Sequence, residues 1–428
     1  MKTVGIIAEY NPFHNGHKYQ IEKAKELTGA DYCIVVMSGN FVQRGTPAIM
    51  DKYLRTKAAL MCGADLVIEL PVHYAAASAE YFASGAVTIL DRLGVTDCLC
   101  FGSECGNIEI LSDISDVLIS ESDEFKNVLK QRLKEGIPYP KARNDAICSA
   151  APHLTEHLDV LSYPNNILGL EYIKALKKRK SNIVPYTVSR IGAGYNDADL
   201  GDFCSSALAV REAIMNQNDI RVIKKQIPDC VYELLEKNYL KTFPVFPEDI
   251  SILLHYKFFL EQAEGFEKYF DIDANFSDKL KKYLPNSNSY HDLCDTLKSK
   301  NMTYTRVARN LLHILLNIYQ SDMDAYCSQD YVYYARMLGF RKEASALLNA
   351  IKSGSSIPLI SKLADATACI EAANNINTAD GSTSTSISAN GIKMLQCDIQ
   401  ASHLYSMVVQ HKFDQDFCNE YTEPVIIF

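Results

Sequence analysis

The sequence has 428 residues and a net charge of −9, with 47% hydrophobic and 22% charged residues. Its length allows two or three domains, and its composition is that of a globular protein. The acidic balance argues against nucleic-acid binding over the whole surface, although it permits a local basic face. We see no secretory signal and no apolar run near the roughly 20 residues that span a bilayer. We therefore expect a cytoplasmic protein with no membrane contact.

The 13 cysteines are an odd number in a sequence without a secretory signal, so we expect reduced thiols rather than disulfides. Three of them cluster at Cys98, Cys100 and Cys105, but their spacing is not typical of a zinc site. We predict no protein-bound metal centre.

Short apolar runs alternate with amphipathic segments up to about residue 215. Such alternation predicts βαβ units and an α/β fold with a parallel sheet. Ligands bind at the carboxyl ends of parallel strands, so we expect the loops Glu9–His17, Ser38–Gly45 and Gly102–Glu104 to converge on one site. The predicted strands are Val4–Ile7, Asp31–Ser38, Asp65–Leu70, Asp97–Phe101 and Asn182–Arg190.

The composition changes after about Asn216, where aromatic and Leu-rich helical patterns predominate. We predict a parallel-sheet domain over residues 1–215 and a mostly α-helical domain over residues 216–428. The Ser/Thr/Gly-rich stretch Thr378–Gly391 is typical of a mobile loop.

The first predicted strand leads into His14-Asn15-Gly16-His17, which opens a helical pattern. A helix N-terminus presents unpaired N–H groups that suit phosphate, and Gly16 allows close approach of a ligand. The two imidazoles can donate hydrogen bonds to phosphate oxygens and stabilise charge in a transition state. The alternative is a pair of surface histidines in a loop, which the position after a first strand disfavours.

HxGH after a first strand resembles the nucleotidyltransferase superfamily, which includes the class I aminoacyl-tRNA synthetases. The longer string GIIAEYNPFHNGH, with SGNFVQRGTPAIMDKYLRTKAAL at residues 38–60, resembles the bacterial tRNA(Met) cytidine acetate ligases. This resemblance implies a Rossmann-like nucleotidyltransferase domain that binds ATP, over residues 1–215, and a tRNA-binding domain over residues 216–428.

The resemblance also implies roles for individual residues. In the family, ATP contacts lie in two motifs that this sequence matches. The first is PNNILGLEY at 164–172, which implies a contact from Asn165, with Asn166 as a second candidate. The second is SRIGAGY at 189–195, which implies a contact from Arg190. Arg211 matches the arginine of a second superfamily motif and is a candidate phosphate contact. His14 and His17 would be catalytic. The implied ATP-binding residues are Ile7, Ala8, Glu9, Tyr10, Asn11, Pro12, Phe13, His14, Asn15, Gly16, His17, Lys18, Tyr19, Gln20, Gly102, Asn165 and Arg190.

The implied reaction joins acetate to ATP, with Mg²⁺ shielding the phosphates, and gives acetyl-adenylate and pyrophosphate. The acetyl group then passes to N4 of the wobble cytidine of elongator tRNA(Met), giving N4-acetylcytidine. Candidate tRNA contacts are Arg306, Arg336 and Arg341, which lie among aromatic residues. No protein partner is implied. Two alternatives remain: an adenylyltransferase acting on a small phosphate-containing acceptor, and a non-catalytic RNA-binding protein.

Overall fold

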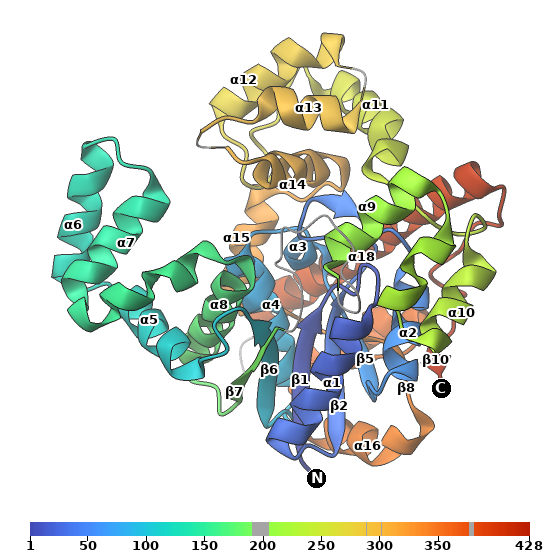
Figure 1. Ribbon diagram of the computed structural model, residues 1–428. Coiled ribbons are helices and arrows are strands. Elements are labelled where there is room, and N and C mark those ends of the chain that lie inside the picture. Colours follow the sequence, from blue (N-terminus) through green and yellow to red (C-terminus); the bar gives the residue numbers. More distant parts are fainter. Residues whose placement is uncertain (191–204, 288, 301, 376–380) are drawn as a thin grey trace.

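A central eight-stranded sheet organises the molecule (Figure 1). The computed structural model describes residues 1–190, 205–287, 289–300, 302–375 and 381–428. The sheet order is β10-β8-β5-β2-β1-β6-β7, with β9 paired to β8. The five strands from β5 to β7 in this order are parallel, and β8 runs antiparallel to β5. The strands are β1 (Thr3–Ala8), β2 (Tyr32–Ser38), β5 (Leu66–Leu70), β6 (Cys98–Ser103), β7 (Val184–Ser189), β8 (Ala335–Phe340), β9 (Leu359–Ile360) and β10 (Ile426–Ile427), with a separate hairpin of β3 (Phe41–Val42) and β4 (Thr46–Pro47).

Both faces of the sheet are covered by helices. Successive side chains of a strand point to opposite faces, so Val4 and Ile6 of β1 pack into one core while Ile7 packs into the other. Helices α1 (Asn15–Thr28), α2 (Lys52–Met61) and α10 (Asp229–Asn238) contribute to the first core. The other is covered by α3 (Val72–Ala75), α4 (Ala79–Arg92), α8 (Pro164–Arg179) and α18 (Gly381–Phe413).

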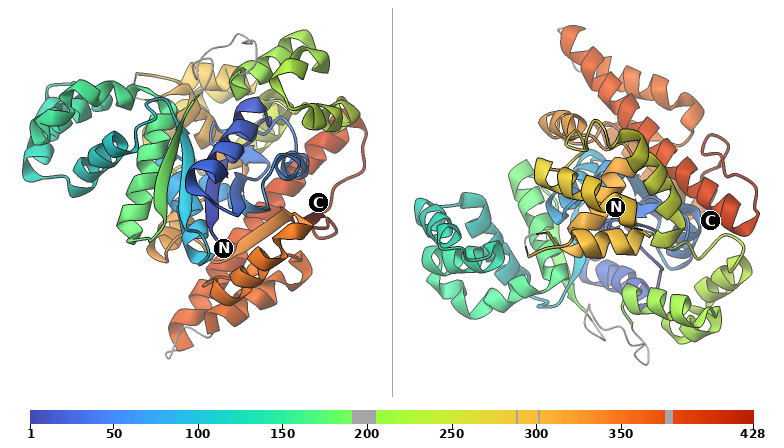
Figure 2. Two further views of the ribbon diagram at one scale, coloured as in Figure 1. Left: turned by 60° about the horizontal axis from the view of Figure 1, so that its bottom comes forward. Right: turned by 90° about the horizontal axis from the view of Figure 1, so that it is seen from above.

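Some of the remaining helices stand away from the sheet. Figure 1 shows α11 to α14 together at the top of the molecule, while α6 and α7 stand beside the body. Figure 2 shows α6 and α7 standing away from the body from two other directions. None of the helices in the described part of the chain is both long and apolar enough to cross a membrane. Their bounds are α5 (Ile108–Ser120), α6 (Asp123–Lys134), α7 (Tyr139–Ala150), α9 (Ala207–Gln217), α11 (Ser251–Glu261), α12 (Ala274–Tyr283), α13 (Tyr290–Leu297), α14 (Tyr304–Leu315), α15 (Gln320–Ser328), α16 (Ser345–Gly354) and α17 (Ala366–Asn375).

The strand order reverses at β1, which lies between β2 on one side and β6 on the other. Loops that leave two adjacent strands in opposite directions open a crevice at their carboxyl ends, where ligands of such sheets bind. The α/β fold and its parallel sheet are thus confirmed.

Two features of the second half differ from the prediction. It supplies β8, β9 and β10 to the central sheet in addition to its helices. Residues 381–391, predicted as part of a mobile loop, instead begin α18. Further along this helix Met394, Leu395 and Tyr405 are buried in the core, and that packing outweighs the weak helix preference of the Ser- and Thr-rich start.

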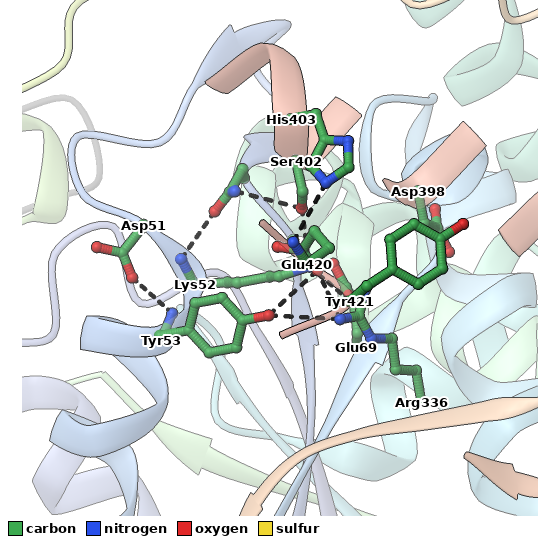
Figure 3. A network of polar contacts seen from close by, with 12 residues as sticks. Asp51, Lys52, Tyr53, Glu69, Arg336, Asp398, Ser402, His403, Glu420 and Tyr421 are labelled. Carbon is green, nitrogen blue, oxygen red and sulfur yellow. Dashed lines mark hydrogen bonds and ion pairs between the residues drawn. The ribbon is translucent and has the colours of Figure 1, made fainter. Parts of the chain in front are cut away.

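A buried ion network connects the two halves of the chain (Figure 3). The ammonium group of Lys52 on α2 lies 2.8 Å from Glu69 of β5 and 2.9 Å from Glu420 near the C-terminus. The guanidinium of Arg336 on β8 pairs with the same two carboxylates. This corrects the prediction that Arg336 contacts tRNA, because its side chain is only 6% exposed and its charge is already neutralised.

Glu420 holds two buried cations, so its removal should be costly. Burial alone would raise the pKa of its carboxyl, but Lys52 and Arg336 outweigh burial and lower the pKa to about 2. Glu420→Gln should therefore lower the free energy of unfolding by about 3–5 kcal/mol, the usual effect of leaving a buried charge unpaired. Urea unfolding at pH 7 measures this change.

The same carboxylate should contribute to acid sensitivity. Its pKa is depressed in the folded state, so its contribution is complete above its unfolded pKa of about 4.5 and is lost as pH falls toward 2. Stability of the Glu420→Gln protein should change less with pH over this interval. Glu423→Gln, at an exposed position on the same segment, is the control. Equal stability of the two variants would contradict this account of the network.

Candidate active site

A cavity lies at the carboxyl ends of β1 and β6. The predicted loops Glu9–His17 and Ser38–Gly45 and residue Gly102 all contribute to it, as does the N-terminal turn of α8. Fourteen predicted residues line it: Ile7, Ala8, Glu9, Tyr10, Asn11, His14, Gly16, His17, Tyr19, Gln20, Gly102, Asn165, Arg190 and Arg211. Four others from the predicted segment, Pro12, Phe13, Asn15 and Lys18, are not among its lining residues.

His14 and His17 form the N-terminal cap of α1. Nδ1 of His14 accepts a hydrogen bond from the backbone N–H of Gly16 at 3.1 Å, and Nδ1 of His17 accepts one from the backbone N–H of His14 at 3.2 Å. A neutral imidazole that accepts at Nδ1 carries its proton at Nε2. Both histidines are therefore fixed as Nε2–H donors, and both line the cavity.

The two imidazoles are stacked, with ring centroids 3.7 Å apart, and His14 is only 6% exposed. Burial, together with the charges of Arg190 and Arg211, lowers the pKa of His14 to about 3. Burial, His14 and Arg190 also lower the pKa of His17 well below its ordinary value. Both rings are thus neutral near pH 7, and can donate hydrogen bonds without repelling the two arginines.

Two glycines keep space open around this pair. A Cβ on Gly16 would lie 2.9 Å from Cε1 of His14 and would displace the capping ring. A Cβ on Gly102 would make only ordinary contacts, the nearest at 3.6 Å from Cγ of Arg190, and would protrude among the residues that line the cavity. Gly16 therefore serves the local backbone, while Gly102 leaves room for a ligand.

The two asparagines that begin α8 have different surroundings. Asn166 is fully buried, and its side chain accepts from the backbone N–H groups of Glu104 and Cys105 and donates to the carbonyl of Val160. Its hydrogen bonds are internal, which corrects its candidacy as an ATP contact. Asn165 donates its side-chain amide to Glu104 at 2.6 Å, and this fixes it at the cavity wall.

Two arginines bring positive charge to the cavity. Arg190 follows β7 and makes no side-chain hydrogen bond or ion pair within the described residues. Arg211 on α9 donates to the backbone carbonyl of Asn11. The rest of the SRIGAGY string, from residue 191 on, lies outside the described residues. Planar guanidinium groups at these positions suit phosphate oxygens.

The remaining wall comes from residues that carry only weak signals in the sequence. Gln43 and Arg44 join the cavity from the β3–β4 hairpin, and the backbone N–H of Gln43 is held by the Glu9 carboxylate at 2.8 Å. Aromatic side chains from three elements, Phe82, Phe101 and Tyr172, form an apolar part of the lining. Only the fold brings these distant residues together.

The site contains neutral N–H donors, two arginines and a helix N-terminus, a set suited to binding and stabilising a polyphosphate. The described residues that line it include no Asp, and so provide no Ser-His-Asp arrangement. Among the described residues, no group of three or more His, Cys, Asp or Glu side chains could hold a metal ion.

Comparison with known proteins agrees with this chemistry. Residues 1–420 match the family described as HIGH Nucleotidyl Transferase. The chain is 38% identical to the tRNA(Met) cytidine acetate ligase of Acetivibrio thermocellus over the full length of both. It is 42% identical to that of Caldanaerobacter subterraneus, over 87% of this chain and 91% of the relative. The chain belongs to the tRNA(Met) cytidine acetate ligase family.

Two solved structures of this family resemble the chain closely. Thermotoga maritima TmcAL in an apo form superposes with a TM-score of 0.90 at 30% identity, over the full length of both chains. A second structure of that protein, bound with alpha-thio ATP, gives a TM-score of 0.88 over 100% of this chain and 99% of the other. The family assignment therefore rests on sequence and on fold.

The state of the two histidines can be observed directly. Because their pKa values are lowered, to about 3 for His14, neither ring should take up a proton between pH 5 and pH 8. ¹⁵N NMR of the ligand-free protein should show both as neutral Nε2–H tautomers throughout this range. Titration of His14 or His17 near pH 6.5 would contradict the assignment.

Proposed function

We propose that this protein is an ATP-dependent ligase that forms acetyl-adenylate from acetate and ATP, and acetylates N4 of the wobble cytidine of elongator tRNA(Met). The observation that carries the proposal is the stacked pair of Nε2–H donors at the start of α1, in a cavity with Arg190 and Arg211. The names of the relatives and the ATP-analogue complex of the Thermotoga protein support it.

The first step needs charge stabilisation more than proton transfer. Acetate is already ionised near pH 7, so its oxygen can attack the α-phosphorus of ATP directly. Negative charge on the phosphoryl oxygens is then stabilised by His14, His17 and the N–H groups that begin α1. Arg190 and Arg211 bind the phosphates of the leaving pyrophosphate. Mg²⁺ would enter with ATP, held mainly by its phosphates. Among the described residues that line the cavity, Glu9 supplies a carboxylate.

In the second step the N4 amine of cytidine attacks the acetyl carbonyl and AMP leaves. The cavity lining is drawn from residues up to Arg211, which supports placing the catalytic part within residues 1–215. A reaction that uses ATP and tRNA also supports a cytoplasmic location.

The predicted tRNA contacts in the second half are unequal candidates. Arg306 on α14 already forms a two-point ion pair with Asp271, at 2.6 and 2.9 Å. Arg341 follows β8, whose carboxyl end pairs with the start of β5, so it lies at the sheet edge opposite the cavity. Arg309, one turn after Arg306, has no hydrogen bond or ion pair with described residues, and its helix packs on Gly45 beside the cavity loop. We favour Arg309 over Arg341 as an RNA contact.

Loss of either histidine should impair adenylation. His14→Ala or His17→Ala should slow acetyl-adenylate formation by roughly 10²–10³-fold, the usual effect of removing one preorganised donor. ATP affinity should fall less, because the backbone donors remain. The measurement is acetate-dependent exchange of labelled pyrophosphate into ATP, without tRNA. His403→Ala, on α18 and absent from the cavity lining, is the control.

The whole reaction is tested with labelled acetate, ATP and tRNA, followed by mass spectrometry of the tRNA nucleosides. N4-acetylcytidine that appears only when ATP and acetate are both present supports the proposal. Transfer of AMP to a small phosphate-containing acceptor, without acetate-dependent exchange, would instead identify an adenylyltransferase.

A further inference from the structure

The pair of helices α6 and α7 projects from the body of the molecule in all three views (Figures 1 and 2). Residues 123–145, which include the turn between these helices, carry six Lys or Arg and four Asp or Glu residues, in a chain whose net charge is −9. This local excess of positive charge contrasts with the acidic character of the whole protein. Whether it is available to a ligand depends on which of these charges are paired within the protein.

The acidic side chains of this pair of helices are mostly engaged internally. Asp145 and Glu135 both pair with Arg132, at 2.9 and 3.0 Å, and Glu124 accepts from the hydroxyl of Ser149. The basic side chains are thereby left in excess. The four exposed lysines, which have no hydrogen bond or ion pair with the described residues, are Lys126, Lys130, Lys134 and Lys141.

The most basic run of the sequence behaves differently. On α8, Lys177 pairs with Asp116 at 2.7 Å, Lys174 with Glu171 at 2.9 Å and Arg179 with Asp91 at 3.1 Å. These cations are neutralised within the protein. Sequence alone favours α8 as a basic surface, whereas the pairing leaves α6 and α7 with the unpaired charge.

The arrangement of the lysines suits an extended polyanion. Lys126, Lys130 and Lys134 are four residues apart and therefore lie along one face of α6, which ends at Lys134. Beyond the turn, Tyr139 at the start of α7 is 56% exposed, and Leu133 before the turn is 44% exposed. An exposed aromatic ring between two lysines is the combination that RNA-binding surfaces use, because the ring can stack on a base while the ammonium groups contact phosphates.

The chain continues from α7 through a 3₁₀ segment, Pro152–Ser162, into α8. The first turn of α8 carries Asn165 and Leu168 of the cavity lining. The two helices are thus built onto the element that forms one wall of the cavity. A nucleic acid that inserts one nucleotide into the cavity extends outward from it and can lie against α6 and α7.

We propose that α6 and α7 form a tRNA-binding surface in which Lys134 and Lys141 contact phosphates and Tyr139 stacks on a base. The proposal rests on the proposed function for its ligand. It places an RNA contact within the first half of the chain, in addition to those expected in the second.

The test compares two double variants of the full-length protein. Lys134→Glu with Lys141→Glu changes the proposed surface. The control, Lys352→Glu with Lys362→Glu, makes the same change of charge at exposed lysines on α16 and after β9. This region lies at the amino ends of the parallel strands, because Gly354 at the end of α16 packs against Gly94, which precedes β6. Binding of unmodified tRNA is measured by filter binding at several salt concentrations, with tRNA-free pyrophosphate exchange measured in parallel.

The first variant should weaken tRNA binding at least tenfold and reduce the slope of log affinity against log salt by about 1.5, since two phosphate contacts release fewer counterions. The control should remain within twofold of wild type. Tyr139→Ala should weaken binding about fivefold or more without changing the slope, because stacking releases no counterions. Pyrophosphate exchange should be unchanged in all three variants, since none of these residues lines the cavity.

Equal affinity and equal slope for the two double variants would overturn the proposal. So would loss of pyrophosphate exchange in the Lys134/Lys141 variant, because these residues would then act on the ATP site. Wild-type protein that forms acetyl-adenylate but fails to bind tRNA would refute the tRNA part of the proposed function, and this surface with it. Wild-type binding with no effect of the variants refutes the surface alone.

Discussion

The cavity depends on one buried guanidinium. Arg55 on α2 has no exposed surface, and it donates hydrogen bonds to the backbone carbonyls of Glu9 and Ser38 at 2.8 Å, as well as to those of Gly39 and Met50. Glu9 directly follows β1, Ser38 ends β2, Gly39 follows it, and Met50 lies just before α2. A guanidinium without acceptors would be very costly in this position, so the loops are held where the carbonyls can satisfy it. Arg55 therefore ties together the segments that form the cavity walls.

The same helix supplies a second buried cation three residues earlier. Lys52 joins β5 to β8 and to the C-terminal segment through Glu69, Arg336 and Glu420. Its backbone N–H also donates to Asn40, in the loop between β2 and the β3–β4 hairpin, at 2.8 Å. The loop that brings Gln43 and Arg44 to the cavity is thus connected to the C-terminal residues. All the described residues that line the cavity precede the predicted domain boundary near residue 215. The ion network nevertheless joins residues on both sides of this boundary.

The electrostatics of the site follow from burial. Two neutral imidazoles beside two arginines give a cavity that attracts phosphate while keeping the histidines as donors of defined orientation. If the rings were charged, they would repel the arginines and each other at a centroid distance of 3.7 Å. The capping hydrogen bonds of α1 therefore do two things: they stabilise the helix start and they orient the Nε2–H groups.

Local sequence was sufficient for much of this structure. The apolar run from Val4 to Ile7, the turn at Asn11-Pro12 and the helical pattern after Gly16 placed the two histidines at a helix N-terminus, because strand, turn and helix preferences act over a few residues. The spacing of further apolar runs predicted the parallel sheet, and parallel strands bring their following loops to one edge. Fourteen of the predicted ligand residues line the cavity for this reason.

Tertiary structure decided what depends on partners distant in the sequence. Arg336 lies among aromatic residues in the sequence, a pattern that favours a surface cation. It is buried instead, because the fold places Glu69 and Glu420, from distant parts of the chain, beside its guanidinium. In the sequence, Asn166 is as good a candidate ligand as its neighbour Asn165. In the fold, its side-chain oxygen accepts hydrogen bonds from two backbone N–H groups of the turn after β6. The lysine-rich run on α8 pairs with acids that are distant in the sequence: Lys177 with Asp116, Lys178 with Glu80, and Arg179 with Asp91 and Asp330. A sequence specifies the sign of each charge, whereas its availability depends on which opposite charge the fold places beside it.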